Sequence, residues 1–321
     1  MMVEKPSVLI VAGPTASGKS ALALAVAARV GGVVINADSM QVYRELRVLT
    51  ARPTPEEEAQ VPHRLYGVRP AAEPGHAAWW RGHALAEMEA ARAAGRLPIL
   101  CGGTGLYFRA LTHGLADIPE PGDAARAEAR ALLAELGPAG LHARLTAADP
   151  ATAATLRPTD SQRLARAWEV WRGTGRGLSD WQRAGGTGPA PWCFAAILID
   201  PPREALRAAI AARFDAMLAA GALEEVRALL ALGLDPALPA MRAHGVPELS
   251  AHLQGRLTLA AASERARLVT SQYTKRQATW FRHHALAAPD RTHMIHARFA
   301  GLTQFSNKIV DQFFAFVDLV A

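Results

Sequence analysis

One stretch near the N-terminus has the residue types and spacing of a phosphate-binding loop. It follows the apolar run 8–12 and matches the pattern G-x-x-x-x-G-K-[ST]. Its residues are Gly13, Pro14, Thr15, Ala16, Ser17, Gly18, Lys19 and Ser20. The glycines let backbone N–H groups turn towards an anion, Lys19 adds a positive charge, and Ser20 would hold a magnesium ion. We therefore expect a bound polyphosphate here, with a tight turn and an incidental lysine as the alternative.

Polar residues also follow two other apolar runs that are typical of buried strands. Asp38 comes after the run 33–36, and the glycine-rich segment 102–105 comes after the run 97–101. Ligands of open α/β sheets bind at the carboxyl ends of parallel strands, so Asp38 is a candidate catalytic carboxylate. The Thr104 hydroxyl and nearby backbone N–H groups could meet a phosphate. The alternatives are a helix cap or turn at Asp38 and a plain tight turn at 102–105.

Asp200 has the surroundings of the Walker B aspartate that binds magnesium in many phosphate-loop proteins, because four apolar residues precede it. Pro201 and Pro202 follow at once, and a long basic helix is predicted next. We interpret Asp200 as the end of a strand whose side chain caps that helix. This interpretation favours phosphate chemistry other than ATP hydrolysis or a kinase reaction.

Two segments, 162–166 and 275–284, are rich in cations and have aromatic residues in or near them. Helical spacing places Arg163 and Arg166 on one face. We expect these cations to lack nearby neutralising partners and to contact the phosphates of a nucleic-acid backbone. The aromatic residues are better explained as core, since each must bury a large apolar area.

The composition is that of a globular protein with a polyanionic partner. The 321 residues exceed what one hydrophobic core usually organises, so we expect a large domain carrying a smaller one. The net charge is +6 and the isoelectric point is near 9.8, which is compatible with binding of nucleic acid. The only two cysteines lie inside apolar segments, which favours a reducing cytoplasm, and no C-x-x-C or H-E-x-x-H motif indicates metal ligands among the cysteines and histidines. No apolar run is long enough for a membrane span, so we expect no membrane association.

The order of the predicted elements explains how the polar side chains come together. Apolar runs alternate with helical patterns along the first part of the chain, which predicts an α/β fold with a parallel sheet. The predicted strands are 8–12, 33–36, 97–101 and 195–200. The phosphate loop and Asp38 should therefore lie beside each other at the carboxyl edge of the sheet.

The remaining sequence has mainly helical patterns. Residues 119–190 form a predicted helical insertion, with breaks at Gly137-Pro138 and Asp149-Pro150. The core is then divided into 1–118 and 191–321. Further helices are predicted over 203–232, over 263–284 and, as a packed terminal helix, over 309–317.

Six motifs, in order from about residue 8 to residue 283, resemble the bacterial tRNA isopentenyltransferases, also called tRNA dimethylallyltransferases. The motifs are 13–20, 38–43, 62–65, 102–107, 158–163 and 274–282. Members of this family transfer the dimethylallyl group of dimethylallyl diphosphate to N6 of the adenosine 3′ of the anticodon, in tRNAs that read codons beginning with U. The resemblance implies a sheet like that of P-loop NTPases, with flanking helices and an all-helical insertion domain that grips tRNA.

The resemblance also implies a role for individual residues. The loop would hold a diphosphate leaving group rather than ATP, and Asp38 would accept the proton of the adenine amine. Thr104 and Arg213 would bind the diphosphate, and Mg²⁺ on Ser20 would be the cofactor. The adenine must leave the anticodon stack to reach the electrophile.

The same motif alignment implies contacts with the tRNA anticodon stem-loop. The candidate residues are Asp38, Ser39, Met40, Gln41, Thr104, Arg126, Gln162, Arg163, Leu164, Ala165, Arg166, Arg242, Gly245, Lys275, Arg276, Gln277, Thr279, Trp280 and Arg282. The chain departs from the family at Thr159, where asparagine is usual, and at Val246, where tyrosine is usual. Residues beyond about 290 match no family motif, and we expect a monomer.

Two other functions fit parts of the sequence. An ATP-dependent small-molecule or nucleoside kinase would have a similar phosphate loop and would use Asp38 to deprotonate its acceptor. A non-catalytic RNA-binding module would use nucleotide occupancy only to switch its affinity. A requirement for dimethylallyl diphosphate, without ATP, separates the transferase from the kinase, and a covalent product separates it from the binding module.

Overall fold

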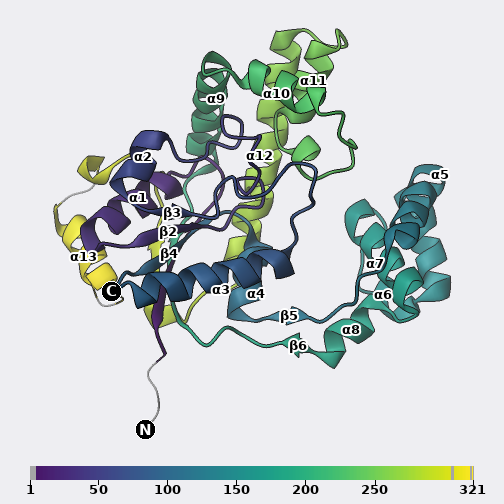
Figure 1. Cartoon of the computed structure of the whole chain (residues 1–321), viewed down its shortest axis with the longest axis horizontal. Coiled ribbons are helices and arrows are strands. Elements are labelled where there is room, and N and C mark those ends of the chain that lie inside the picture. The colour runs from purple at the N-terminus through teal and green to yellow at the C-terminus, as the bar shows by residue number, and fades with distance from the viewer. Residues whose placement is uncertain (1–4, 305–306, 319, 321) are drawn as a thin grey trace. The chain divides into compact units, whose positions relative to one another are not determined.

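The chain divides into two compact units (Figure 1). The computed structural model describes residues 5–304, 307–318 and 320. One unit, here called the core unit, consists of residues 1–112 and 190–321, and the other, the insertion unit, consists of residues 113–189.

A six-stranded parallel sheet forms the centre of the core unit, with the strand order β3-β2-β4-β1-β7-β8. The strands are β1 (Ser7–Ala12), β2 (Val33–Asn36), β3 (His63–Arg64), β4 (Pro98–Gly102), β7 (Cys193–Ile199) and β8 (Thr292–Ile295). The strand register places Val11 of β1 between Cys101 of β4 and Ile197 of β7. The four predicted strands are confirmed. The edge strands β3 and β8 escaped prediction because they are short and lack the continuous apolar run of a buried strand.

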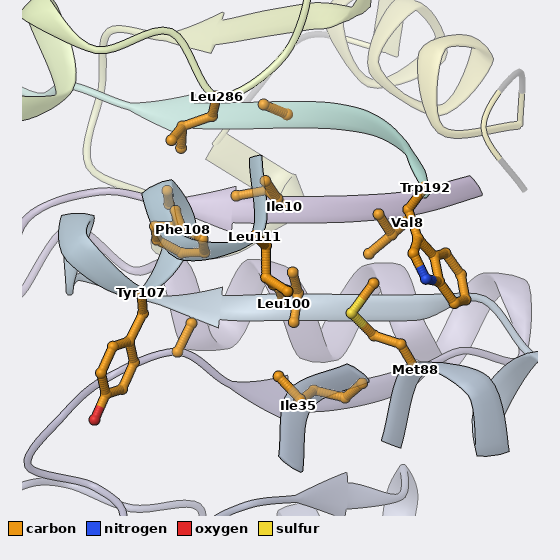
Figure 2. Close-up of a cluster of buried hydrophobic side chains, with 14 of the residues drawn as sticks. Val8, Ile10, Ile35, Met88, Leu100, Tyr107, Phe108, Leu111, Trp192 and Leu286 are labelled. Atoms are coloured by element: carbon orange, nitrogen blue, oxygen red, sulfur yellow. The ribbon is translucent and has the colours of Figure 1, made fainter. Parts of the chain in front are cut away.

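Side chains of β1 alternate between two hydrophobic clusters, because successive residues of a strand point to opposite faces of the sheet. Val8 and Ile10 pack on one face, where Figure 2 shows them near Leu100 of β4. Leu9 and Val11 pack on the other face. Helices α3 (Ala77–Ala93) and α4 (Gly105–Thr112) supply the first cluster, and α1 (Lys19–Val30) and α13 (Asn307–Asp318) supply the second.

Helices after β7 build a third cluster in the core unit. They are α9 (Arg203–Ala219), α10 (Ala222–Ala231), α11 (Val246–Leu253) and α12 (Leu259–His283), with the 3-10 turn η1 (Ala240–Arg242) between α10 and α11. The prediction of one helix over 203–232 is wrong, since the chain turns at Gly221, which has a φ of 96°. Helix α12 begins before the expected position, because the Thr258 side chain accepts a hydrogen bond from the Ala261 N–H and caps it.

Short elements complete the core unit. Helix α2 (Pro55–Gln60) precedes β3, and the 3-10 turns η2 (Pro289–Arg291) and η3 (Leu302–Gln304) flank β8. The terminal helix predicted over 309–317 lies within α13, where Phe313 and Val317 are buried. Within the described residues, no helix is both long and apolar enough to cross a membrane.

The insertion unit has four helices and its own hydrophobic cluster among the residues described. They are α5 (Asp123–Ala148), α6 (Pro150–Ala153), α7 (Ser161–Thr174) and α8 (Leu178–Ala184), and β5 (Leu115–Ala116) pairs antiparallel with β6 (Gly186–Thr187). Both predicted breaks are present. Gly137, with a φ of 66°, kinks α5 before Pro138, and the Asp149 side chain caps α6. Leu141, Leu145 and Trp168 are buried in the cluster.

Candidate active site

The phosphate loop connects β1 to α1 in a tightly defined conformation. The Ser17 N–H donates to the Pro14 carbonyl at 3.2 Å, and Ala16 and Gly18 have φ values of 65° and 92°. A Cβ at Gly18 would lie 1.9 Å from the Phe299 carbonyl oxygen, so only glycine fits there. A left-handed φ is unfavourable for alanine, so neighbouring contacts must hold Ala16 in place.

Lys19 is the cation at the base of this loop. Its side chain is buried, with 8% of the residue exposed, and Nζ donates to the Pro14 carbonyl at 3.4 Å. Burial lowers the pKa of Lys19, while the Asp38 carboxylate opposes that shift and Arg213 adds to it. An anion bound in the loop would stabilise the charged ammonium in this surrounding. Ser20 is exposed in the first turn of α1.

The carboxylate of Asp38 is oriented by its own turn. Asn36 is fully buried, and its Oδ1 accepts the Asp38 N–H at 2.8 Å while its Nδ2 donates to the Asp38 carbonyl at 3.0 Å. The Met40 N–H donates to Asp38 Oδ1 at 2.9 Å. For Asp38 Oδ2, we find no hydrogen bond to another described residue. The turn expected as the alternative is thus present, and it leaves one carboxylate oxygen for a ligand.

The ends of β2 and β4 are joined through Thr104. The Ser39 N–H donates to Thr104 Oγ1 at 2.9 Å, and Thr104 Oγ1 lies 3.3 Å from Ser39 Oγ. The Thr104 N–H donates to the Ala37 carbonyl at 3.2 Å. The structure therefore brings Thr104 and the Asp38 turn together at the carboxyl edge of the sheet.

Gln277 of α12 links the phosphate loop to the loop after β4. Its Oε1 accepts the Thr15 N–H at 2.9 Å and the Thr15 hydroxyl at 3.2 Å, and its Nε2 donates to the Gly103 carbonyl at 2.9 Å. Only 5% of Gln277 is exposed. The family resemblance implied a tRNA contact at Gln277, whereas in the structure its amide holds two candidate phosphate-binding loops together.

Arg213 enters the site from α9. Its Nη2 donates to the Thr50 carbonyl at 3.3 Å. Burial lowers the pKa of Arg213, the Asp38 carboxylate opposes this, and Arg298 adds to it. Arg213 thus interacts electrostatically with Lys19, Asp38 and Arg298, and a group of three cations and one carboxylate favours a polyanionic ligand.

An aromatic pair lies near this group and was not singled out from the sequence. The rings of His244 and Tyr273 are 4.7 Å apart, and the Arg276 guanidinium lies 5.5 Å from the centre of the Tyr273 ring. Burial raises the pKa of Tyr273 to about 12 and lowers that of His244. Tyr273, Arg276, Gln277 and Trp280 share one face of α12 by their spacing, which is the signal that could have identified Tyr273.

Several predicted tRNA-binding residues are exposed on the core unit. These residues are Arg242, Lys275, Arg276, Thr279 and Arg282. Arg282 forms a bidentate pair with Asp200, with both N–O distances 2.9 Å. The interpretation of Asp200 as a helix cap is wrong, because Pro202 begins α9 without a side-chain cap and the Asp200 carboxylate binds Arg282 instead.

Other predicted tRNA-binding residues of the core unit have structural partners. Gln41 Nε2 donates to the Thr50 and Ala51 carbonyls at 2.9 Å each. Gly245, with a φ of 96°, donates its N–H to Glu248 at the start of α11. Trp280 is partly buried and stacks on His284 at 4.2 Å.

Carboxylates pair with the three insertion-unit arginines that were predicted to contact tRNA, contrary to the expectation that Arg163 and Arg166 are unpaired. Each acidic partner is close in sequence, so the spacing could have revealed the pairs. The pairs are Arg126 with Glu120 and Asp123, Arg163 with Asp160, and Arg166 with Glu169. Leu164 is fully buried, Ala165 is partly buried and Gln162 is exposed. The prediction that Trp168 belongs to the core is confirmed.

Two family models match the chain. A model described as isopentenyl transferase matches residues 6–75, and one described as IPP transferase matches residues 41–284. The chain belongs to the IPP transferase family. The motif resemblance is therefore confirmed, and this family assignment extends over most of the core unit and all of the insertion unit.

Curated relatives and solved structures agree with membership of the IPP transferase family. The tRNA dimethylallyltransferase of Granulibacter bethesdensis is 63% identical over 316 residues, covering 98% of this chain and 99% of the relative. That of Gluconacetobacter diazotrophicus is 65% identical over 297 residues, covering 92% and 90%.

Two solved transferase structures have folds similar to that of this chain. The tRNA isopentenylpyrophosphate transferase of Bacillus halodurans has a TM-score of 0.68 at 30% identity, covering 98% of this chain and 97% of that one. A eukaryotic dimethylallyltransferase acting on tRNA has a TM-score of 0.75 at 25% identity, covering 97% and 80%.

Proposed function

We propose that the chain transfers the dimethylallyl group from dimethylallyl diphosphate to N6 of the adenosine 3′ of the anticodon in tRNAs reading codons that begin with U. The observation that carries this proposal is the full-length similarity to tRNA dimethylallyltransferases. The geometry supports it, since a phosphate loop and an oriented carboxylate meet at one edge of the sheet. The kinase alternative has no comparable support among the relatives.

In this reaction, Asp38 takes up the proton of the adenine amine. The N6 lone pair forms the new bond to the allylic carbon, the carbon–oxygen bond breaks, and the diphosphate leaves with that electron pair. Asp38 Oδ1 accepts the Met40 N–H, so we assign Oδ2 as the atom that receives the proton. Asn36 fixes the backbone on both sides of the carboxylate and thereby its direction.

The cations stabilise the charge that develops on the leaving diphosphate. Lys19 and Arg213 are held in place before the reaction, and Thr104 presents its hydroxyl at the end of the neighbouring strand. Fixed groups of this kind are effective because they need no reorganisation as the charge develops.

A magnesium ion suits the donor set of this site. Among the described residues, no cluster of three or more His, Cys, Asp or Glu side chains is present that could hold a metal by itself. Ser20, the last residue of the loop, would offer its hydroxyl, since Mg²⁺ commonly binds with few protein ligands, water and substrate phosphates. When bound, the ion would supply further charge stabilisation to the diphosphate.

The partner in this proposal is the tRNA anticodon stem-loop, which the insertion unit would grip. Lys275 and Arg276 on α12 would contact its phosphates. We further propose a monomeric protein of the cytoplasm, a reducing compartment that suits the free thiols of Cys101 and Cys193.

Nucleoside mass spectrometry tests the proposal directly. Unmodified tRNA is incubated with the protein, Mg²⁺ and dimethylallyl diphosphate, and a parallel sample receives ATP instead of the prenyl donor. We expect dimethylallyl-adenosine to form in the first sample, without ATP. No product in the first sample, with ATP consumed in the second, would favour the kinase.

A further inference from the structure

The segment after β8 reaches the phosphate loop because of the sheet topology. All the strands of the six-stranded sheet are parallel, and β8 pairs with β7, which pairs with β1. The chain leaving β8 therefore emerges at the same edge as the chain leaving β1. Residues 298–299 lie there, beyond the residues that the two family models match.

Two consecutive carbonyls of the phosphate loop are bound by this segment. Arg298 Nε donates to the Ala16 carbonyl at 3.0 Å, and the Phe299 N–H donates to the Ser17 carbonyl at 2.8 Å. In a trans peptide the C=O and the following N–H point in opposite directions. Binding the Ser17 carbonyl from this side therefore directs the Gly18 N–H to the other side.

Phe299 anchors the segment in the core. It is 3% exposed and belongs to the same hydrophobic cluster as Leu22 of α1 and Phe313 of α13. A backbone atom next to such a buried ring is well fixed, because protein cores are close-packed. The contact can therefore hold Ala16 and Gly18 in their left-handed conformations.

Arg298 also brings a charge to the site. Its guanidinium is held at the loop by the Ala16 carbonyl, and its positive charge adds to the lowering of the Arg213 pKa. Positive charges gathered around the phosphate loop repel one another when no ligand is bound. An anion bound among them offsets this repulsion.

We propose that Arg298 is a positioning residue of the diphosphate site, which braces the phosphate loop through Ala16 and adds positive charge there. The inference rests on the proposed function for the identity of the ligand, a diphosphate. It makes the C-terminal part of the chain, for which the sequence motifs suggested no role, a component of donor binding.

Isothermal titration calorimetry with magnesium diphosphate tests this inference on the full chain. The variants are Arg298→Ala, Arg298→Lys and the control Arg29→Ala, which removes an exposed arginine that pairs with Asp318 of α13. We expect Arg298→Ala to weaken binding about tenfold, as for the loss of one charge-assisted contact, and Arg298→Lys to recover part of the affinity by keeping the charge. The control should bind like the wild type.

Steady-state kinetics separates positioning from general damage to the fold. Arg298→Ala should raise the KM for dimethylallyl diphosphate by a similar factor and leave the KM for tRNA unchanged. Affinity for magnesium diphosphate within twofold of wild type in Arg298→Ala would overturn the inference. A wild-type protein that binds magnesium diphosphate but forms no prenylated tRNA would instead contradict the proposed function, while the comparison of variants would still decide this inference.

Discussion

Asp38 has one carboxylate oxygen engaged by its own turn, and the other is the proposed proton acceptor. Replacing Asp38 with asparagine keeps an oxygen for the Met40 N–H but removes the base. We expect Asp38→Asn to lower kcat by about 10²- to 10⁴-fold, the usual contribution of a general base, and to weaken tRNA binding far less than that. Single-turnover prenylation and tRNA binding measured on the same variant check this. Unaltered single-turnover rates would show that Asp38 is not the base.

His244 makes stability depend on pH in a defined direction. Burial lowers the pKa of His244 from its ordinary value of 6.5, with Arg276 adding to the effect and Glu248 and Asp38 opposing it. As the pH falls below 6.5, the unfolded chain takes up this proton before the folded protein does, so stability is lost. We expect the free energy of unfolding to fall less between about pH 7 and about pH 5 in His244→Gln than in the wild type.

Chemical denaturation at each pH measures this difference. Exposed His283 provides the matched control. His283→Gln removes an imidazole at the surface, whereas His244→Gln removes one that is partly buried. Equal pH dependence in His244→Gln and wild type would mean that His244 does not contribute in this way.

At the scale of elements, helix α12 combines two different tasks. One face holds the phosphate loop through buried Gln277, while Lys275 and Arg276 are exposed. In the described part of the chain, neither of these two cations forms an ion pair with a carboxylate, whereas Arg282 is paired with Asp200. Lys275 and Arg276 are therefore better placed than Arg282 to bind tRNA phosphates.

We expect the double variant Lys275→Ala, Arg276→Ala to weaken tRNA binding and to lower its dependence on salt. Each lost phosphate contact reduces the slope of log K against log salt concentration by about one. Filter binding over a series of salt concentrations measures the slope. Arg227→Ala on α10, which removes an exposed arginine paired with Glu224, is the control. A double variant with the wild-type slope would exclude phosphate contacts by these two residues.

At the scale of the whole molecule, the insertion unit begins and ends at adjacent points of the core unit. The Ala190 N–H donates to the Leu111 carbonyl at 2.8 Å, so the two points where the chain leaves and re-enters the core unit are adjacent. A short glycine-serine linker can therefore replace residues 113–189 without stretching the core.

We expect this excised protein to bind magnesium diphosphate like the wild type and to lose most of its tRNA affinity. Calorimetry with magnesium diphosphate and filter binding with tRNA provide the two measurements on one preparation. The first also serves as the folding control for the second. If tRNA affinity survives the excision, the insertion unit does not grip tRNA.

Local patterns in the sequence determined the phosphate loop, the four central strands and the helical character of the insertion. These features depend on neighbouring residues, since a buried strand needs an apolar run and a phosphate loop needs glycines at set positions. The positions of Asp38 and Thr104 at one edge followed from the parallel order of the strands.

Only the tertiary structure decided which polar side chains act together. Gln277 and Thr15 are 262 residues apart in the chain, Arg298 and Ala16 are 282 apart, and Arg282 and Asp200 are 82 apart. An amide or guanidinium can bond many partners, and no local pattern selects one. The packing of α12 and the pairing of β8 with β7 bring these groups into range, so the partners depend on the folded arrangement of distant elements.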